Sequence, residues 1–346
     1  MAVGTGTRTR AHTIRPYPQL AMKAVLDFIS RYQLGLVLLA LVAGFIIPEF
    51  FAPLNPLNSF FLMVIMFATG IRLDYAALLM QVKDWRTLLL AVSMMMVIMP
   101  FLITIPLKFF APDWTLPFIL AAAMPTGLTA PAVMAIMGGR TSLALLISVS
   151  TSVVAPFVVP IMLNVLIGET VAIDTVSMMT NISVVVIVPL LLAGIVQWKA
   201  GKKRIQKADA AIRMGNLAAF ALVIASVTAS SASSGAQTGA AWLGIGADGI
   251  IIVFLMIVFW FGIAWLAASL LAWRDKLDRL TIIFCLMYMN TTLGVWLADR
   301  FFRDTGIAPK LVAIFVATTI ILPLFKLYIP AEKRRGYARI YAVEQT

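Results

Sequence analysis

The chain has very few of the residues on which disulfides, metal centres and soluble surfaces depend. Its 346 residues include one cysteine, Cys285, one histidine, His12, and only 12% charged residues. A single cysteine excludes an intramolecular disulfide and a cysteine-rich metal site. One histidine in the N-terminal tail argues against zinc chemistry or a histidine proton relay. Because no nucleophile and base stand in a catalytic motif, we expect that the protein is not an enzyme.

Apolar sequence takes the place of these missing residues. Hydrophobic residues make up 62% of the chain, whereas about a quarter of the residues in a soluble domain are charged. This composition is typical of a polytopic membrane protein. The net charge of +12 would suggest nucleic acid as a partner of a soluble protein. Here the basic residues lie between apolar segments, so we predict that the partner is the lipid bilayer and not nucleic acid.

About ten segments are long and apolar enough to cross a bilayer as helices, which predicts an all-α membrane protein. They are residues 34–52, 55–71, 86–107, 114–138, 141–167, 177–198, 214–234, 244–273, 280–302 and 308–329.

The basic residues gather in alternate connections between these segments. The longest basic run, Lys199–Arg213, is interpreted as a solvated loop that is attracted to anionic lipid. The positive-inside rule then places both termini in the cytoplasm, with the chain in the cytoplasmic (inner) membrane, and this requires an even number of spans. The predicted units are a cytoplasmic N-terminal tail with an interfacial helix, two five-helix repeats and a cytoplasmic C-terminal tail, at residues 1–33, 34–167, 168–329 and 330–346.

Two of the apolar segments are interrupted by polar and helix-breaking residues. The fourth contains Pro125–Pro131 and the ninth contains Met289–Gly294. A proline removes a backbone donor, and the freed groups are tolerated in a bilayer only where protein or a wet cavity surrounds them. The two breaks hold the same position in two blocks of five spans. Because five is odd, they predict a 5+5 inverted repeat in which broken helices four and nine cross at the midplane.

A half-helix begins at each break, and its unpaired N–H groups and positive dipole end attract an anion. We expect Gly127 to adopt a backbone conformation closed to other residues, and Pro131 to lie in the first turn of its half-helix. The alternative is a proline kink whose threonines bond to their own helix. The predicted site for a small organic anion comprises Thr126, Gly127, Thr129, Pro131, Asn290, Thr291 and Thr292.

Hydroxyl groups in the fifth segment are the candidate ligands for a cation. Ser148 and Ser152 are one helical turn apart and share a face, and with Asn290 they form the candidate cation site. The alternative is that these small residues mark a helix–helix interface. No ionisable residue is assigned to the membrane interior, so the usual group for proton coupling is missing. We predict no cofactor, with Na⁺ as the candidate ion.

Four motifs in this layout resemble the bile acid:sodium symporter family. They are Met66–Gly70, Met124–Pro131, Ser148–Pro156 and Met289-Asn290. The resemblance implies ten spans in a panel and a core domain, with crossed discontinuous helices four and nine in the core. It also implies an organic anion as the substrate and, in many members, coupling to sodium.

The chain departs from this family at the polar residues of the sodium-coupled members. Cys285 stands for a glutamate, Met289 and Met95 stand for glutamines, and Ser148 stands for a threonine. Ala130 and Pro131 replace a Ser-Asn pair. The resemblance therefore implies that the scaffold is retained while most side-chain ligands for sodium are lost.

These observations favour a secondary transporter of a small organic anion that works by alternating access without the two-sodium scheme of the family. One weak sodium site of neutral oxygens, protons carried by the substrate and no coupling at all are the three alternatives for its coupling. A passive anion channel and a non-transporting membrane receptor are the alternatives. An arsenite-type exporter is a third, although that group relies on a cysteine at the first crossing, where this chain has Thr126–Pro131.

Overall fold

The computed structural model describes residues 35–36, 39–73, 75, 85–168, 173–233 and 246–321. These residues form helices and one isolated β-bridge but no strand, so the predicted all-α class is confirmed. The predicted tails at 1–33 and 330–346 lie outside the described residues.

Helical residues at 35–36 and 39–46 come first. The helices that follow are α2 (Pro48–Phe51), η1 (Ala52–Leu57), α3 (Asn58–Gly70), α5 (Trp85–Ser93), η2 (Met94–Ile98), α6 (Met99–Phe110), α7 (Pro112–Ala123), α8 (Ala130–Met137), α9 (Thr141–Ile167), α10 (Thr175–Ile182), η3 (Ser183–Ile187), α11 (Val188–Ala200), α12 (Lys202–Ser233), α13 (Ala247–Ser269), α14 (Lys276–Met287), α15 (Thr291–Phe301), η5 (Arg303–Thr305) and α16 (Ala308–Ile321).

Six continuous helical stretches in the described residues have the length and composition of membrane spans. Large apolar side chains such as Leu191, Phe254 and Leu266 are about 60% exposed on them, at 63, 59 and 63%. Such surfaces would aggregate in water but suit lipid tails. The chain is therefore a multi-pass membrane protein. The six stretches are Pro48–Gly70, Trp85–Phe110, Thr141–Ile167, Thr175–Ala200, Lys202–Ser230 and Asp248–Ser269.

Two further apolar segments are each split into two shorter helices at the predicted breaks. Helix α7 ends at Ala123 and α8 begins at Ala130, while α14 ends at Met287 and α15 begins at Thr291. Pro131 lies in the first turn of α8, as expected. A proline costs little there because the N–H groups of a first turn have no partner within the helix.

The prediction for the start of the second span is wrong by seven residues. The structure interrupts the helical run at Ile47, and the next helix begins at Pro48 rather than at residue 55. A proline at the first helical position is pre-set for the helix, whereas the residue before it is pushed out of the helical region. Prolines 53 and 56 remain inside the helical stretch, as part of the 3₁₀ turn η1.

The prediction of a solvated loop at Lys199–Arg213 is also wrong. Helix α11 ends at Ala200, only Gly201 separates it from α12, and α12 begins at Lys202. Gly201 has a φ of +78°, which suits glycine at a sharp turn. Alanine, lysine, arginine and glutamine are strong helix formers, so a charged segment can extend a membrane helix beyond its apolar part.

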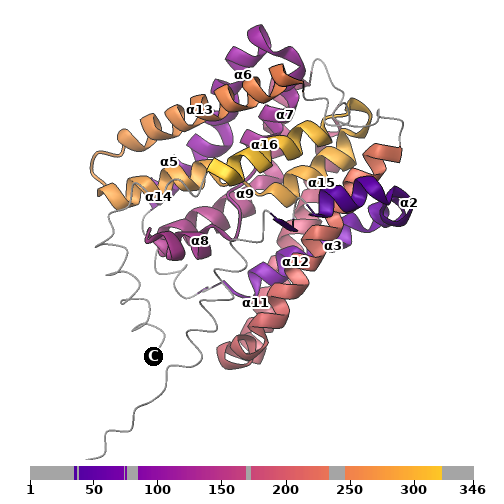
Figure 1. The fold of residues 1–346 in the computed structure, drawn as a ribbon. Helices are drawn as coiled ribbons and strands as arrows, with labels where there is room; N and C mark the ends of the chain where they lie inside the picture. Colours follow the sequence, from indigo (N-terminus) through magenta and orange to yellow (C-terminus); the bar gives the residue numbers. More distant parts are fainter. Residues whose placement is uncertain are drawn as a thin grey trace, which may run out of the picture.

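The helices form two groups (Figure 1). The small helix group contains α2, η1, α3, α11 and α12, with α3 packed against both α11 and α12. The large helix group contains α5–α9 and α13–α16, with α9 in contact with α5, α7, α8 and α14. Figure 1 shows the small group at the lower right and the large group above it. Helix α10, which continues through η3 into α11, packs against α9 of the large group.

Candidate functional site

The two breaks are in direct contact with each other. They form the isolated antiparallel bridge of the structure. The Gly127 N–H donates to the Tyr288 carbonyl at 2.8 Å, and the Asn290 N–H donates to the Pro125 carbonyl at 2.7 Å. Backbone groups that the helix ends leave free thus find partners in the opposite break, which makes irregular backbone possible inside the protein.

Glycine is required at position 127 because of packing. The prediction that Gly127 uses a special backbone conformation is wrong, since its φ is not positive. A Cβ atom at this position would lie 2.9 Å from Cε1 of Tyr288 and 3.4 Å from the Met289 carbonyl. The absence of a side chain lets the two breaks approach closely enough to form their hydrogen bonds.

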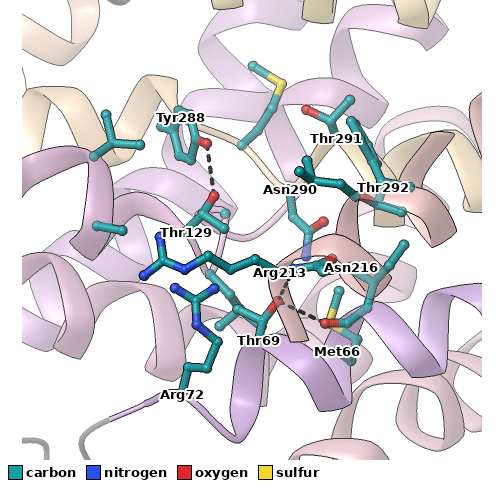
Figure 2. Close-up of a pocket in the computed structure, with 18 residues that line it drawn as sticks. Met66, Thr69, Arg72, Thr129, Arg213, Asn216, Tyr288, Asn290, Thr291 and Thr292 are labelled. Carbon is teal, nitrogen blue, oxygen red and sulfur yellow. Dashed lines mark hydrogen bonds between the residues drawn. The ribbon is translucent and has the colours of Figure 1, made fainter. Parts of the chain in front are cut away.

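A cavity of about 170 Å³ lies between the small and the large helix group, against the breaks (Figure 2). The small group contributes side chains of α3 and α12, and the large group contributes the two breaks and the start of α8. The lining residues include Met66, Thr69, Arg72, Leu128, Arg213, Asn216, Phe220, Tyr288 and Met289.

The structure brings five of the seven predicted anion-site residues to this cavity, namely Gly127, Thr129, Asn290, Thr291 and Thr292. Thr126 and Pro131 are buried outside its lining. The Thr126 hydroxyl lies 3.0 Å from both the Met95 sulfur and the Cys285 carbonyl oxygen.

The two breaks bring polar groups into the cavity wall. The hydroxyls of Thr129 and Tyr288 are 2.9 Å apart and join the breaks through their side chains. The Asn290 side chain caps α15 by accepting the Leu293 N–H at 3.1 Å. Such a cap satisfies one of the free N–H groups of a helix start.

Several backbone donors at the cavity have no hydrogen-bond partner within the described part of the chain. Four lining residues contribute N–H groups for which no acceptor is found among the residues that the structure describes. Two belong to the first break and two to the first turn of α15, where the helix dipole is positive. Donors of this kind form anion-binding sites. The four residues are Leu128, Thr129, Thr291 and Thr292.

The two serines of the candidate cation site bond to backbone carbonyls. The Ser148 hydroxyl donates to the Ala144 carbonyl at 2.7 Å and to the Gly127 carbonyl at 3.2 Å. The Ser152 hydroxyl donates to the Ser148 carbonyl at 2.7 Å. Both serines lie outside the cavity lining, and Ser148 supports the first break from behind. Among the described residues, no group of three or more His, Cys, Asp or Glu side chains could hold a metal ion.

Sequence reasoning missed the charged residues at this cavity. Arg72 and Arg213 line it, although Arg213 was interpreted as part of a solvated loop and Arg72 was not among the predicted site residues. Asp209 accepts the Arg72 Nε–H at 2.8 Å and the Arg213 Nε–H at 2.7 Å. The sequence feature that could have revealed this pair is Asp209 four residues before Arg213 within the basic run. This is the spacing of an ion pair on one helix face.

A family model described as the SBF-like CPA transporter family matches residues 31–325. Two Bacillus subtilis (strain 168) proteins are similar to the chain. YocS, named as an uncharacterized sodium-dependent transporter, is 24% identical over 288 residues, which are 81% of this chain and 84% of YocS. YbaS is 25% identical over 195 residues, which are 56% of this chain and 62% of YbaS, so the match spans less than two thirds of that protein. Because the family model covers most of the chain, the protein belongs to the SBF-like CPA transporter family.

Proposed function

We propose that this protein is a secondary transporter that carries a small organic anion across the cytoplasmic membrane. The observation that carries the proposal is the meeting of two broken helices at a cavity wall, where four backbone N–H groups lack an acceptor among the described residues. Half-helix N-termini that face a cavity inside the membrane are a recurring anion site in transporters. Thr129 and Asn290 are the proposed substrate contacts from the two breaks.

Transport in this proposal follows alternating access. The small and the large helix group act as panel and core of a ten-span, 5+5 inverted repeat, with each pair of half-helices counted as one span. The cavity lies between the two groups, so a movement of one group against the other would expose the breaks to either side. Both termini are proposed to be cytoplasmic.

We further propose that the protein does not use the two-sodium scheme of related symporters. The hydroxyls of Ser148 and Ser152 donate to backbone carbonyls, and the Thr126 hydroxyl is within 3.0 Å of the Met95 sulfur. Hard cations prefer several oxygen ligands, usually with carboxylates among them. YocS is named as a sodium-dependent transporter. That name describes the relative and does not establish sodium coupling in this protein.

The substitution Asn290→Asp tests the anion site. Aspartate still caps α15 through its oxygen, and a negative charge is favourable at a helix start, so the variant should fold. The same charge would repel an anionic substrate. We expect uptake into proteoliposomes to fall by about tenfold or more, the scale of a lost charge-assisted hydrogen bond. Thr129→Val should reduce uptake as well.

Thr180→Val is the matched control for Thr129→Val. The Thr180 hydroxyl donates within α10, to the Val176 carbonyl at 2.9 Å, and Thr180 lies outside the cavity lining. Uptake at the wild-type rate by the Asn290 variant would rule out the proposed site. Flux that does not saturate with substrate would favour a channel, and binding without flux would favour a receptor.

A further inference from the structure

The wall of the cavity opposite the breaks carries two arginines. Arg72 directly follows α3 and Arg213 lies in α12, and both line the cavity. Figure 2 shows the two guanidinium groups next to each other, and Thr129 lines the same cavity. The small helix group therefore presents two cations to the space that the half-helix N-termini of the large group also line.

One carboxylate holds both arginines. Arg72 Nε lies 2.8 Å from one oxygen of Asp209, and Arg213 Nε lies 2.7 Å from the other. The side chains of Arg72, Asp209 and Arg213 are 21, 16 and 15% exposed. Two positive charges and one negative charge give this triad a net charge of +1 at the cavity.

The contacts with Asp209 occupy the Nε atoms alone. Among the residues that the structure describes, the terminal amino groups of Arg72 and Arg213 have no hydrogen-bond acceptor. A guanidinium group presents its donors in a planar fork that matches a carboxylate. Asp209 fixes both side chains through their Nε atoms. The terminal amino groups of the two arginines are therefore preorganised to bind a second oxyanion.

Electrostatics argue against a purely structural role for the triad. A structural ion pair with Asp209 needs only one arginine, and an unpaired charge away from bulk water is unfavourable. Burial lowers the pKa of Arg72, the neighbouring charge of Arg213 lowers it further, and Asp209 raises it. Arginine still stays protonated, because its ordinary pKa is far above neutral. An anion in the cavity would compensate the remaining charge.

We infer that Arg72 and Arg213 bind the carboxylate of the transported substrate, and that this substrate is a compact organic acid. The inference rests on the proposed transport function. A cavity of roughly 150 Å³ can hold benzene, so a cavity of about 170 Å³ fits an acid with one small ring or a short chain. Met66 and Phe220 supply apolar surface, and the breaks supply hydrogen-bond donors.

The test measures binding of acids and their neutral amides to the purified full-length protein in detergent. The probes are benzoate and benzamide, pyruvate and pyruvamide, and hexanoate and hexanamide, each titrated while the thermal unfolding midpoint is followed. We expect at least one acid to raise the midpoint more than its amide does. Arg72→Gln and Arg213→Gln should each weaken its apparent Kd by about tenfold to a hundredfold, as for hydrogen bonds to a charged group.

Lysine variants separate the loss of the guanidinium group from a folding defect. Arg72→Lys and Arg213→Lys keep the charge beside Asp209 but remove the fork, so they should fold and bind the acid more weakly than the wild type. Arg300→Gln removes an exposed arginine that does not line the cavity and should bind like the wild type. If no acid is distinguished from its amide, or if both Gln variants bind like the wild type, the inference is overturned.

Two further arms separate the possible outcomes. An anionic lipid headgroup offers the same oxyanion chemistry, so the titration is repeated with phosphatidylglycerol. Arginine-dependent stabilisation by this lipid alone would overturn the substrate assignment. Suppose that both Gln variants bind the acid like the wild type while Asn290→Asp loses uptake. This result would reject the arginine site and keep the transport function. Arginine-dependent binding of an acid that shows no saturable uptake would reject the transport function and keep the arginines as its binding site.

Discussion

Sulfur-containing side chains stand beside the breaks at positions where the resemblance to the bile acid:sodium symporters implies polar ligands. The Met95 sulfur lies 3.0 Å from the Thr126 hydroxyl, and Cys285 is fully buried next to the second break. Thioether sulfur is a weak acceptor and a poor ligand for a hard cation. At the scale of single residues, these side chains are the basis of the proposal that the protein does not use the two-sodium scheme.

Uptake should therefore not require sodium. In proteoliposomes, replacing external sodium by potassium is expected to change the initial uptake rate of the bound acid by less than about twofold, because a neutral site with few oxygen ligands binds Na⁺ weakly. Parallel measurement of ²²Na⁺ and substrate gives the stoichiometry. One or more sodium ions entering with each substrate would contradict this prediction, and two would also contradict the proposed loss of the two-sodium scheme.

A polar latch joins the two helix groups at the η1 end of the molecule. The Asn55 amide donates to Asp299 at 3.0 Å, and Arg303 donates to the Asn55 side-chain oxygen at 2.6 Å. One turn away, the Trp296 indole donates to Ser59 at 3.0 Å. These bonds connect η1 and α3 of the small group with α15 and η5. At the scale of elements, the proposed alternating-access cycle would require these bonds to break when the cavity opens on the side of η1.

Asn55→Ala is expected to shift the protein toward a state that is open at the latch. Each hydrogen bond to a charged partner contributes about 1.5–3 kcal/mol, so losing the two Asn55 bonds should change the population of open molecules by tenfold or more. The measurement is the labelling rate of a Ser59→Cys protein by a membrane-impermeant maleimide, with and without Asn55→Ala.

Asn181→Ala is the control for this experiment, because the Asn181 amide bonds within α10, to the Ser177 carbonyl at 2.8 Å. Equal labelling rates in the presence and absence of Asn55→Ala would show that the latch does not hold the two groups together.

At the scale of the whole molecule, side-chain contacts place basic connections on shared faces. The Gln197 amide at the end of α11 donates to the Ile71 carbonyl just after α3, at 2.9 Å. Arg140 between α8 and α9 pairs with Asp275 before α14. Arg274 donates to Thr87 near the start of α5 at 2.6 Å. By the positive-inside rule, these basic ends are expected to face the cytoplasm.

Single-cysteine labelling in intact cells tests this orientation. Lys203→Cys lies at the start of α12 and Asp113→Cys at the start of α7, and both positions are exposed. The native Cys285 is buried and should contribute little background. An impermeant maleimide should label the Asp113 variant from outside, and the Lys203 variant only after permeabilisation. The reverse pattern would overturn the proposed topology.

The amino-acid sequence by itself determined the membrane character, the all-α class and the positions of both helix breaks. These properties follow from local composition: long apolar runs require helices in a bilayer, and prolines with clustered polar residues interrupt them. The same local information failed at Lys199–Arg213, because strong helix formers continued α12 into a charged segment. It also gave the wrong reason for Gly127, where the constraint is a ring from the other break.

Only the tertiary structure decided which polar residues share a cavity. Thr126 and Thr129 are three residues apart, yet the first is buried against α14 and the second lines the cavity beside Tyr288. Arg72 and Arg213 are far apart in the chain, and the packing of α3 against α12 brings them to one carboxylate. Local pattern fixes where a helix can start or break. Contacts between distant segments depend on how whole helices pack, because packing alone sets which faces meet.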